Sequence, residues 1–249
     1  PLLRQLMLRA PGTYSHSMTM ALLSEAAAEA IGANALQVRI CCYYHDIGKT
    51  LQPQYFIENQ RGDLNPHDRL EPRQSARIIK DHVTEGALLG ERFKLPQPVM
   101  DAIWTHHGTD LIKYFYIKAV EEAKPGETVD EKEFRYPGPI PDTREKGIIF
   151  LADRVEAACR TLKDPTINDF RKMTERLTNS AIAAGQFEDC PLTLKEIYKI
   201  IDVFTHTLTS VHHHRIEYPK MPVMKQEQPP DSAVITLESS NPLGVEAES

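Results

Sequence analysis

Five histidines and two aspartates are the residues of this chain that most clearly indicate a chemical function. Imidazole nitrogens and carboxylate oxygens are ligands that divalent transition metals accept where no cysteine takes part. The seven candidate ligands are His16, His45, Asp46, His82, His106, His107 and Asp153. Together they could furnish two octahedral metal sites that share one carboxylate.

The stretch from Tyr43 to Lys49 places a histidine, a carboxylate and a lysine within one helical turn, at the end of an apolar run. A buried imidazole beside a buried carboxylate is costly unless something partners both, and a metal ion is the usual partner. A core histidine hydrogen-bonded to an aspartate would leave the same pattern. This pair alone therefore keeps both interpretations open.

The candidate ligands fall on different predicted helices. Adjacent side chains on a helix diverge by about 100°, so neither His45–Asp46 nor His106–His107 can chelate one metal from a helix face. At a helix end, however, such a pair can flank a cavity that other helices close. Gly48 and Gly108, which favour helix termination, follow the two pairs. We therefore expect a site at the mouth of a helical bundle.

Helical periodicity of apolar residues runs through almost the whole chain and predicts an all-α fold. We find no repeats and no convincing strand pair. The predicted helices cover residues 2–9, Thr13 (as the cap) to Ala30, 36–47, Pro72 past His82, 96–108, 111–123, 143–162, 164 to about 184, and the Thr193–Glu196 capping box to about Ile216.

Two segments depart from this pattern. Residues 124–142 are rich in proline and glycine and are too long for a plain connector, which indicates either an ordered excursion or a mobile loop. After Tyr218–Pro219 the composition turns to Pro, Glu, Ser and Gln. We therefore expect one domain over 1–219, with a loop excursion at 124–142, and a disordered tail over 220–249.

Composition excludes several classes of protein. The 249 residues are 41% hydrophobic and 26% charged, as in a globular protein, and no apolar run approaches the roughly 20 residues that cross a bilayer. The net charge of −6 argues against a nucleic-acid polymer as partner. Four cysteines without a disulfide or zinc-ligand spacing favour a reducing cytoplasmic compartment. The chain begins Pro-Leu-Leu, as a fragment of a longer protein would, although methionine removal would look the same.

The order H…HD…H…HH…D along an all-α chain resembles the HD-domain metal phosphohydrolases. Short sequence motifs around these residues, here called flanking words, make the resemblance more specific. The resemblance extends from Leu2 to Pro219. These words are Ala10-Pro-Gly-Thr-Tyr, Tyr43-Tyr-His-Asp-Ile-Gly-Lys, Tyr55-Phe-Ile-Glu-Asn-Gln, Asn65-Pro-His-Asp, His106-His-Gly-Thr, Tyr114-Phe-Tyr, Phe134-Arg-Tyr-Pro-Gly-Pro and Arg215-Ile-Glu-Tyr-Pro. They are similar to the cytoplasmic HD domain of the seven-transmembrane HD family, whose characterised members are the PgpH-type cyclic di-AMP phosphodiesterases.

The resemblance implies a di-metal phosphodiesterase that hydrolyses cyclic di-AMP to the linear product pApA through a metal-bridging hydroxide. It implies two divalent metals, iron or manganese. One would be held by His16, His45, Asp46 and Asp153, and the other by His82, His106 and His107, with Asp46 bridging. It also implies a membrane protein as parent, whose transmembrane segments are missing from this chain, and leaves homo-oligomerisation open.

Two departures from the family pattern bear on the site and the substrate. Ser15 replaces the first histidine of a usual pair, and we expect His16 to be the ligand. Gly-Thr-Asp follows His107 in place of the Gly-Tyr-Pro of cyclic di-GMP enzymes, which argues against that substrate. The alternatives are an HD phosphohydrolase on another nucleotide, such as cyclic di-GMP or (p)ppGpp, and a metal-binding sensor module without turnover.

Four further residues are candidates around the metals, each with a structural alternative. Lys49, expected to act with Asp46 in catalysis, could neutralise a phosphate oxygen or simply favour a helix C-terminus. Arg135 could clamp the second phosphate or lie in solvent. Tyr114 could stack on adenine or belong to the core. Arg154, next to the ligand Asp153, is a candidate for a supporting group behind the metal ligands.

Overall fold

The structure is a computed structural model, and it describes residues 1–60, 62 and 64–213. The predicted tail over 220–249 lies outside the described residues. The described part contains α-helices and short 3₁₀ turns, and no strand occurs within it, which confirms the predicted all-α fold. The α-helices are α1 (Leu2–Arg9), α2 (Pro11–Ile31), α3 (Ala35–Tyr44), α4 (Pro72–Arg92), α5 (Gln97–Thr105), α6 (Lys113–Glu122), α7 (Arg144–Cys159), α8 (Ile167–Ala183) and α9 (Leu194–His213). No helix in this part is both long and apolar enough to cross a bilayer.

Helix α2 begins two residues before the predicted cap. Pro11 opens the helix because its fixed φ and missing N–H suit the first turn. The N–H groups of Gly12 and Thr13 are satisfied from far along the chain, since both donate to Asn59 Oδ1, at 2.9 and 3.2 Å. The prediction that Thr13 caps this helix was therefore wrong. Gly32 ends α2 with a φ of +69°, as expected.

The predicted helix over 36–47 ends earlier, at Tyr44. His45 follows it directly, and a 3₁₀ turn, η1 (Ile47–Thr50), carries Gly48 against α4. A Cβ at Gly48 would lie 1.9 Å from the carbonyl oxygen of His82. Only glycine permits this approach, and it brings His45 and Asp46 to the side of α4 that carries His82.

The later helices match the prediction more closely. Pro72 occupies the first turn of α4, and Thr193 and Glu196 form the expected capping box of α9. Helix α8 begins at Ile167 and not at Asp164, because Asp164 has a φ of +45°, which lies outside the helical region.

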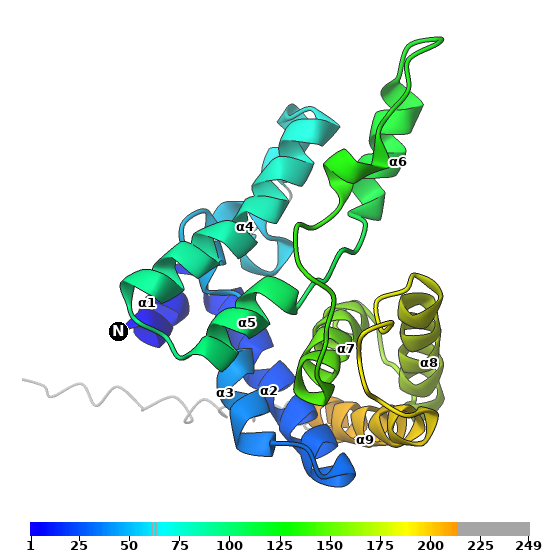
Figure 1. The fold of residues 1–249 in the computed structure, drawn as a ribbon. Coiled ribbons are helices and arrows are strands. Elements are labelled where there is room, and N and C mark those ends of the chain that lie inside the picture. The colour runs from blue at the N-terminus through cyan, green and yellow to red at the C-terminus, as the bar shows by residue number, and fades with distance from the viewer. Residues whose placement is uncertain (61, 63, 214–249) are drawn as a thin grey trace, which may run out of the picture. The chain divides into compact units, whose positions relative to one another are not determined.

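The main core lies among α2, α3, α5, α7 and α9, and α8 packs against α7 and α9 (Figure 1). Helix α7 is its most enclosed element, since every residue from Gly147 to Asp153 is buried. The buried positions include Cys41, Cys42 and Cys159, and all four cysteines are free. Burial raises the pKa of the Cys41 thiol to about 12, which keeps it protonated.

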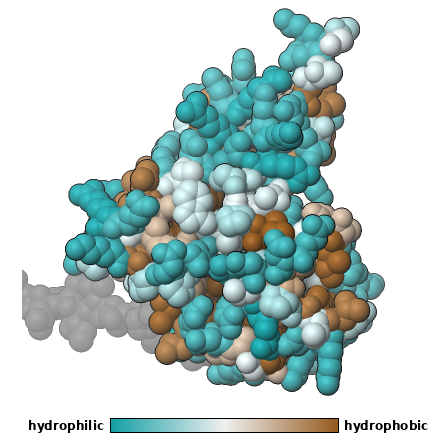
Figure 2. Space-filling model, viewed as in Figure 1, coloured by the Kyte–Doolittle hydropathy of each residue, from teal (hydrophilic) through white to brown (hydrophobic). Residues whose placement is uncertain are grey.

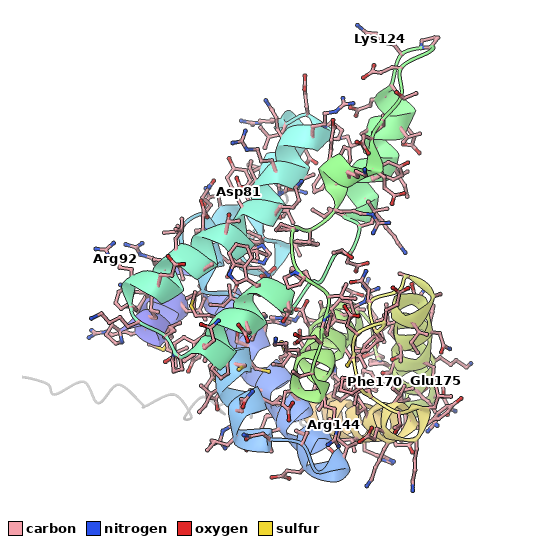
Figure 3. All side chains as sticks on the ribbon, in the orientation of Figure 1. Asp81, Arg92, Lys124, Arg144, Phe170 and Glu175 are labelled. Atoms are coloured by element: carbon pink, nitrogen blue, oxygen red, sulfur yellow. The ribbon has the colours of Figure 1, made fainter. Side chains whose placement is uncertain are left out.

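The Pro/Gly-rich excursion is ordered and has a small core of its own. Phe134, in the 3₁₀ turn η5 (Glu131–Phe134), is fully buried and packs with Phe115 of α6 and Ala76 of α4. In Figures 1 and 3 the excursion extends beyond α6, with Lys124 near its tip. Figure 2 shows that this projecting part presents a mostly hydrophilic surface. Of the two alternatives, the structure supports the ordered excursion.

Replacing Gly48 by alanine is expected to lower the free energy of unfolding by more than about 2 kcal/mol, because the backbone of α4 cannot move aside for a Cβ. Gly90→Ala is the matched control on α4, because its Cβ would meet the far end of a flexible side chain, Met100 Sδ at 2.4 Å, and no backbone atom of another segment. Urea unfolding of both variants measures the difference. Equal stability of the two would contradict a close approach that depends on Gly48.

Candidate metal centre

All seven predicted ligands converge around one carboxylate. His16 comes from the first turns of α2, His45 and Asp46 from the junction of α3 and η1, and His82 from α4. His106 and His107 follow α5, and Asp153 lies in the middle of α7. Asp46 is fully buried, and among the ligands only His107 is partly exposed. Five segments separated along the chain thus meet at Asp46.

Each oxygen of Asp46 faces a different group of histidines. Oδ1 lies 3.3 Å from His82 Nε2 and 3.5 Å from His106 Nε2. Oδ2 lies 3.2 Å from His45 Nε2 and 3.9 Å from His16 Nε2. Asp46 therefore lies between two halves of one centre.

The ligand atoms fall into two sets, in each of which they lie within 4.8 Å of one another. The first set is His16, His45, Asp46 and Asp153, and the second is Asp46, His82, His106 and His107. This division is the one that the family resemblance implies, and Asp46 belongs to both sets.

Backbone carbonyls fix the tautomers of three rings. His45 Nδ1 lies 2.7 Å from the carbonyl oxygen of Cys42, and the corresponding distances are 2.5 Å for His82 and 2.8 Å for His106, each to the carbonyl three residues earlier. A carbonyl oxygen only accepts, so Nδ1 must carry the proton and donate it. Each Nε2 is left with a lone pair that points into the centre, as in metal-binding histidines.

These lone pairs face other electron-rich atoms. His82 Nε2 and His106 Nε2 are 3.1 Å apart, and His45 Nε2 faces Asp46 Oδ2. Neither Asp46 oxygen nor His45 Nε2 has a hydrogen-bond partner in the described part of the chain, although Lys49 Nζ lies 2.7 Å from Oδ2 as an ion pair. Such a buried arrangement is unfavourable on its own, and divalent cations among these atoms would satisfy it. The donor set therefore fits a metal centre.

Burial and neighbouring charges keep most ligands in the protonation state that binds metal. Burial lowers the pKa of His82 well below its usual value, and burial together with His106 lowers the pKa of His107 to about 4. Burial alone would raise the pKa of Asp46, but Lys49 and His45 outweigh it and hold this pKa well below its usual value. The rings of His82 and His107 are therefore neutral, and the Asp46 carboxylate is ionised.

The pKa of His16 is raised by the acidic residues around it. Burial lowers its pKa, but Asp153 and Glu156 outweigh burial and raise the pKa to about 10. His16 Nε2 lies 3.0 Å from Asp153 Oδ1, and Nδ1 pairs with Glu156. The surroundings thus favour a positive charge at this position, which a metal cation would also supply.

Three residues of the centre had no assigned role in the sequence prediction. Glu156, one turn after Asp153, is buried and binds His16 Nδ1. The acidic residue at this helical spacing was the signal that could have identified it. Glu58 binds Lys49 Nζ at 3.0 Å, and Tyr136 stacks on His107 with ring centroids 4.1 Å apart. The last two come from loops, where the sequence carries no spacing rule.

The four predicted supporting residues differ in whether they contact the metal ligands or line the adjacent pocket. Lys49 bridges Asp46 and Glu58, and Tyr114 lies at the rim of an adjacent pocket with 66% of its surface exposed. Arg135 pairs with Glu131 and donates to the carbonyl oxygen of Thr109 at 2.9 Å. Arg154 pairs with Asp110 and lies over the ring of Phe150. Neither arginine lines the pocket.

A cavity of about 590 Å³ adjoins the metal ligands. His16, His82, His107 and Asp153 form part of its wall together with Lys49. Aromatic side chains form much of the remainder, and they are Tyr55, Phe56, Tyr114, Phe115 and Tyr136. A largely apolar wall with a few convergent polar groups is typical of a site for an organic ligand, and these dimensions suit a nucleotide.

Comparison with known proteins gives consistent findings. Residues 13–158 match the HD domain family. The chain is 48% identical over 219 residues to cyclic-di-AMP phosphodiesterase PgpH of Listeria monocytogenes, and 47% identical over 220 residues to that of Bacillus subtilis. In each case 88% of this chain and 30% of the relative are covered, so the chain spans about a third of those proteins.

A solved structure is also similar. The crystal structure of the L. monocytogenes PgpH HD domain in complex with cyclic-di-AMP matches with a TM-score of 0.81 and 47% identity, over 88% of this chain and 100% of that chain. The match confirms the expected helical bundle. It also confirms the predicted resemblance to this family.

Divalent metal is expected to raise the melting temperature of the chain, because binding to the folded state alone shifts unfolding by mass action. The increase should be largely lost in Asp46→Ala, which removes the ligand shared by both sets. Asp189→Ala, at an exposed position, is the control and should keep the full increase. Thermal unfolding with and without manganese measures the effect. An undiminished increase in Asp46→Ala would contradict the assignment of this centre.

Proposed function

The chain belongs to the HD domain family, and we propose that it is a metal-dependent phosphodiesterase that hydrolyses cyclic di-AMP to pApA. The observation that carries this proposal is the buried centre built on Asp46, with lone pairs of three histidines directed at one another and at a carboxylate beside a nucleotide-sized cavity. The names of the PgpH relatives and the cyclic-di-AMP complex of a similar HD domain support the choice of substrate.

The proposed cofactors are two divalent transition metals, iron or manganese, which suit a site of imidazoles and carboxylates without thiolates. The seven ligands would hold them in the two sets described above, with Asp46 shared. When bound, the metals supply Lewis-acid charge and an activated water nucleophile. Hydrolysis adds the water oxygen to one phosphorus and releases the 3′-oxygen of the neighbouring ribose, so that a linear dinucleotide results.

The chain's own groups position these components. Carbonyl oxygens of Cys42, Ile79 and Ile103 accept hydrogen bonds from Nδ1 of three imidazoles. These bonds leave the lone pair of each ring on Nε2, which faces the centre. Lys49, held between Asp46 and Glu58, lies in the cavity wall next to the centre. Its ammonium group would neutralise a phosphate oxygen, and burial does not discharge it, because Asp46 and Glu58 keep its pKa above its usual value.

The aromatic wall is proposed to bind the bases. Tyr114, exposed at the rim, offers a ring face on which an adenine could stack. Tyr136 lies on His107 and closes the wall near the metal ligands. Placement of the chain in the cytoplasm beside membrane-spanning segments of a longer protein, and any homo-oligomer, remain predictions of the family resemblance.

The substrate is tested by incubating the manganese- or iron-loaded chain with cyclic di-AMP and with cyclic di-GMP, and by separating the products chromatographically. Selective conversion of cyclic di-AMP to pApA is expected. Selective conversion of cyclic di-GMP would contradict the substrate assignment, and no turnover of either by metal-loaded protein would contradict the enzymatic function.

Lys49→Ala is expected to lower kcat for cyclic di-AMP by roughly 10²-fold or more, since it removes a charged donor beside the reacting phosphate. The metal content should remain, because Lys49 is not among the ligands. Lys172→Ala, an exposed lysine of α8, is the control. Steady-state kinetics at matched metal content gives the comparison, and a Lys49→Ala rate equal to that of the control would rule out this role.

A further inference from the structure

We propose that Arg160, held by the buried carboxylate of Glu156, binds the second phosphate of a cyclic dinucleotide while the first lies at the metal ligands. This inference rests on the proposed function and adds a residue that determines which phosphodiesters are good substrates. Neither residue was predicted from the sequence.

One face of α7 connects the metal ligands to Arg160. Asp153 and Ala157 of α7 line the cavity, and so do Arg160 and Thr161, which directly follow the helix. Arg160 keeps helical backbone angles, so the spacing of four and seven residues places Ala157 and Arg160 on the same side as Asp153. Side chains on a helix lean toward its N-terminus, and the guanidinium of Arg160 accordingly lies against Glu156. Glu156 is only about 4.5 Å along the helix axis from Asp153. The charge of Arg160 is thus about one helical turn from the reacting centre.

The guanidinium is fixed on one edge. Its Nη2 lies 2.7 Å from both carboxylate oxygens of Glu156, and Nε lies 3.3 Å from Oε1. Glu156 is itself held by His16 Nδ1. Within the described residues Nη1 has no hydrogen-bond partner, and 36% of the Arg160 side chain is exposed. A planar guanidinium held in this way offers its remaining donors to a phosphate without losing much side-chain entropy.

The balance of charges in the cavity wall favours a second cation for a ligand with two phosphates. Of the described residues that line it, Lys49 and Arg160 are the lysine and arginine, whereas Glu58 and Asp153 are acidic. A cyclic dinucleotide carries two phosphates, each with one negative charge, separated by a ribose on either side. Lys49 lies at Asp46 and can serve only the phosphate at the centre. The second phosphate then needs its own cation, and Arg160 is in position to supply it.

Other arginines near the site have partners elsewhere. Arg135, which the sequence predicts for the second phosphate, is paired with Glu131 and lies outside the cavity wall. Arg154 is paired with Asp110 and is also outside it. The arrangement therefore favours Arg160. A diester with a single phosphate would gain nothing from it.

The test compares steady-state hydrolysis of cyclic di-AMP by manganese-loaded wild type, Arg160→Gln and Arg160→Lys. Glutamine can still donate a hydrogen bond to Glu156 but carries no charge, and lysine retains the charge without the planar fork. We expect Arg160→Gln to raise KM roughly 10–100-fold with little change in kcat. Arg160→Lys should lie between it and wild type. Arg171→Ala, an exposed arginine of α8, is the control.

A structural role of Arg160 would show in other measurements. Manganese content and melting temperature of Arg160→Gln should equal those of wild type. The inhibition constant of ApA, which has one phosphate between two adenosines, should also be unchanged. An unaltered KM for cyclic di-AMP, or an equal weakening of ApA, would overturn the inference. If wild-type protein does not hydrolyse cyclic di-AMP, the proposed function itself fails and the inference fails with it.

Discussion

The burial of the charged Asp46 carboxylate is the constraint on which the rest of this structure depends. Its carboxylate is fully buried, and four histidine nitrogens lie within 3.9 Å of its oxygens. Burying an ionised carboxylate is costly unless cations or hydrogen bonds replace water. Lys49 supplies one positive charge, and three of the histidines direct Nε2 lone pairs into the centre, where a divalent metal would bind them together with the carboxylate. The fold therefore holds these side chains around a buried carboxylate in an arrangement that fits a metal centre.

Segments around the centre hold the ligands in this arrangement. The 3₁₀ turn η3 (Ile57–Asn59) supplies two contacts at once, since Asn59 caps α2 near His16 and Glu58 holds Lys49. The excursion, stabilised by the burial of Phe134, places Tyr136 on His107. Segments that the sequence presents as loops thus fix the ligands from outside and form the cavity in which a substrate would lie.

Much of this could be predicted because it follows from local patterns. Helical periodicity gave the all-α fold, and Gly32, Pro72 and the Thr193–Glu196 box mark helix ends correctly. The convergence of the seven ligands was expected from the family resemblance, since each lies on a different helix or at a helix end. The early end of α3 depends on contact with α4, which acts across more than thirty residues and leaves no local signal. The same is true of Asn59 capping α2. The pairing of Arg135 with Glu131, four residues earlier, could have been anticipated.

The measurement that tests the central claim most directly is the metal stoichiometry of the manganese-loaded chain, combined with its electron paramagnetic resonance spectrum. With an ion held by each of the two sets, the shared Asp46 carboxylate would couple the two ions magnetically. The account predicts two manganese ions per chain with a spin-coupled spectrum. One ion per chain, or two ions with the spectrum of isolated manganese, would contradict a centre built on a shared carboxylate.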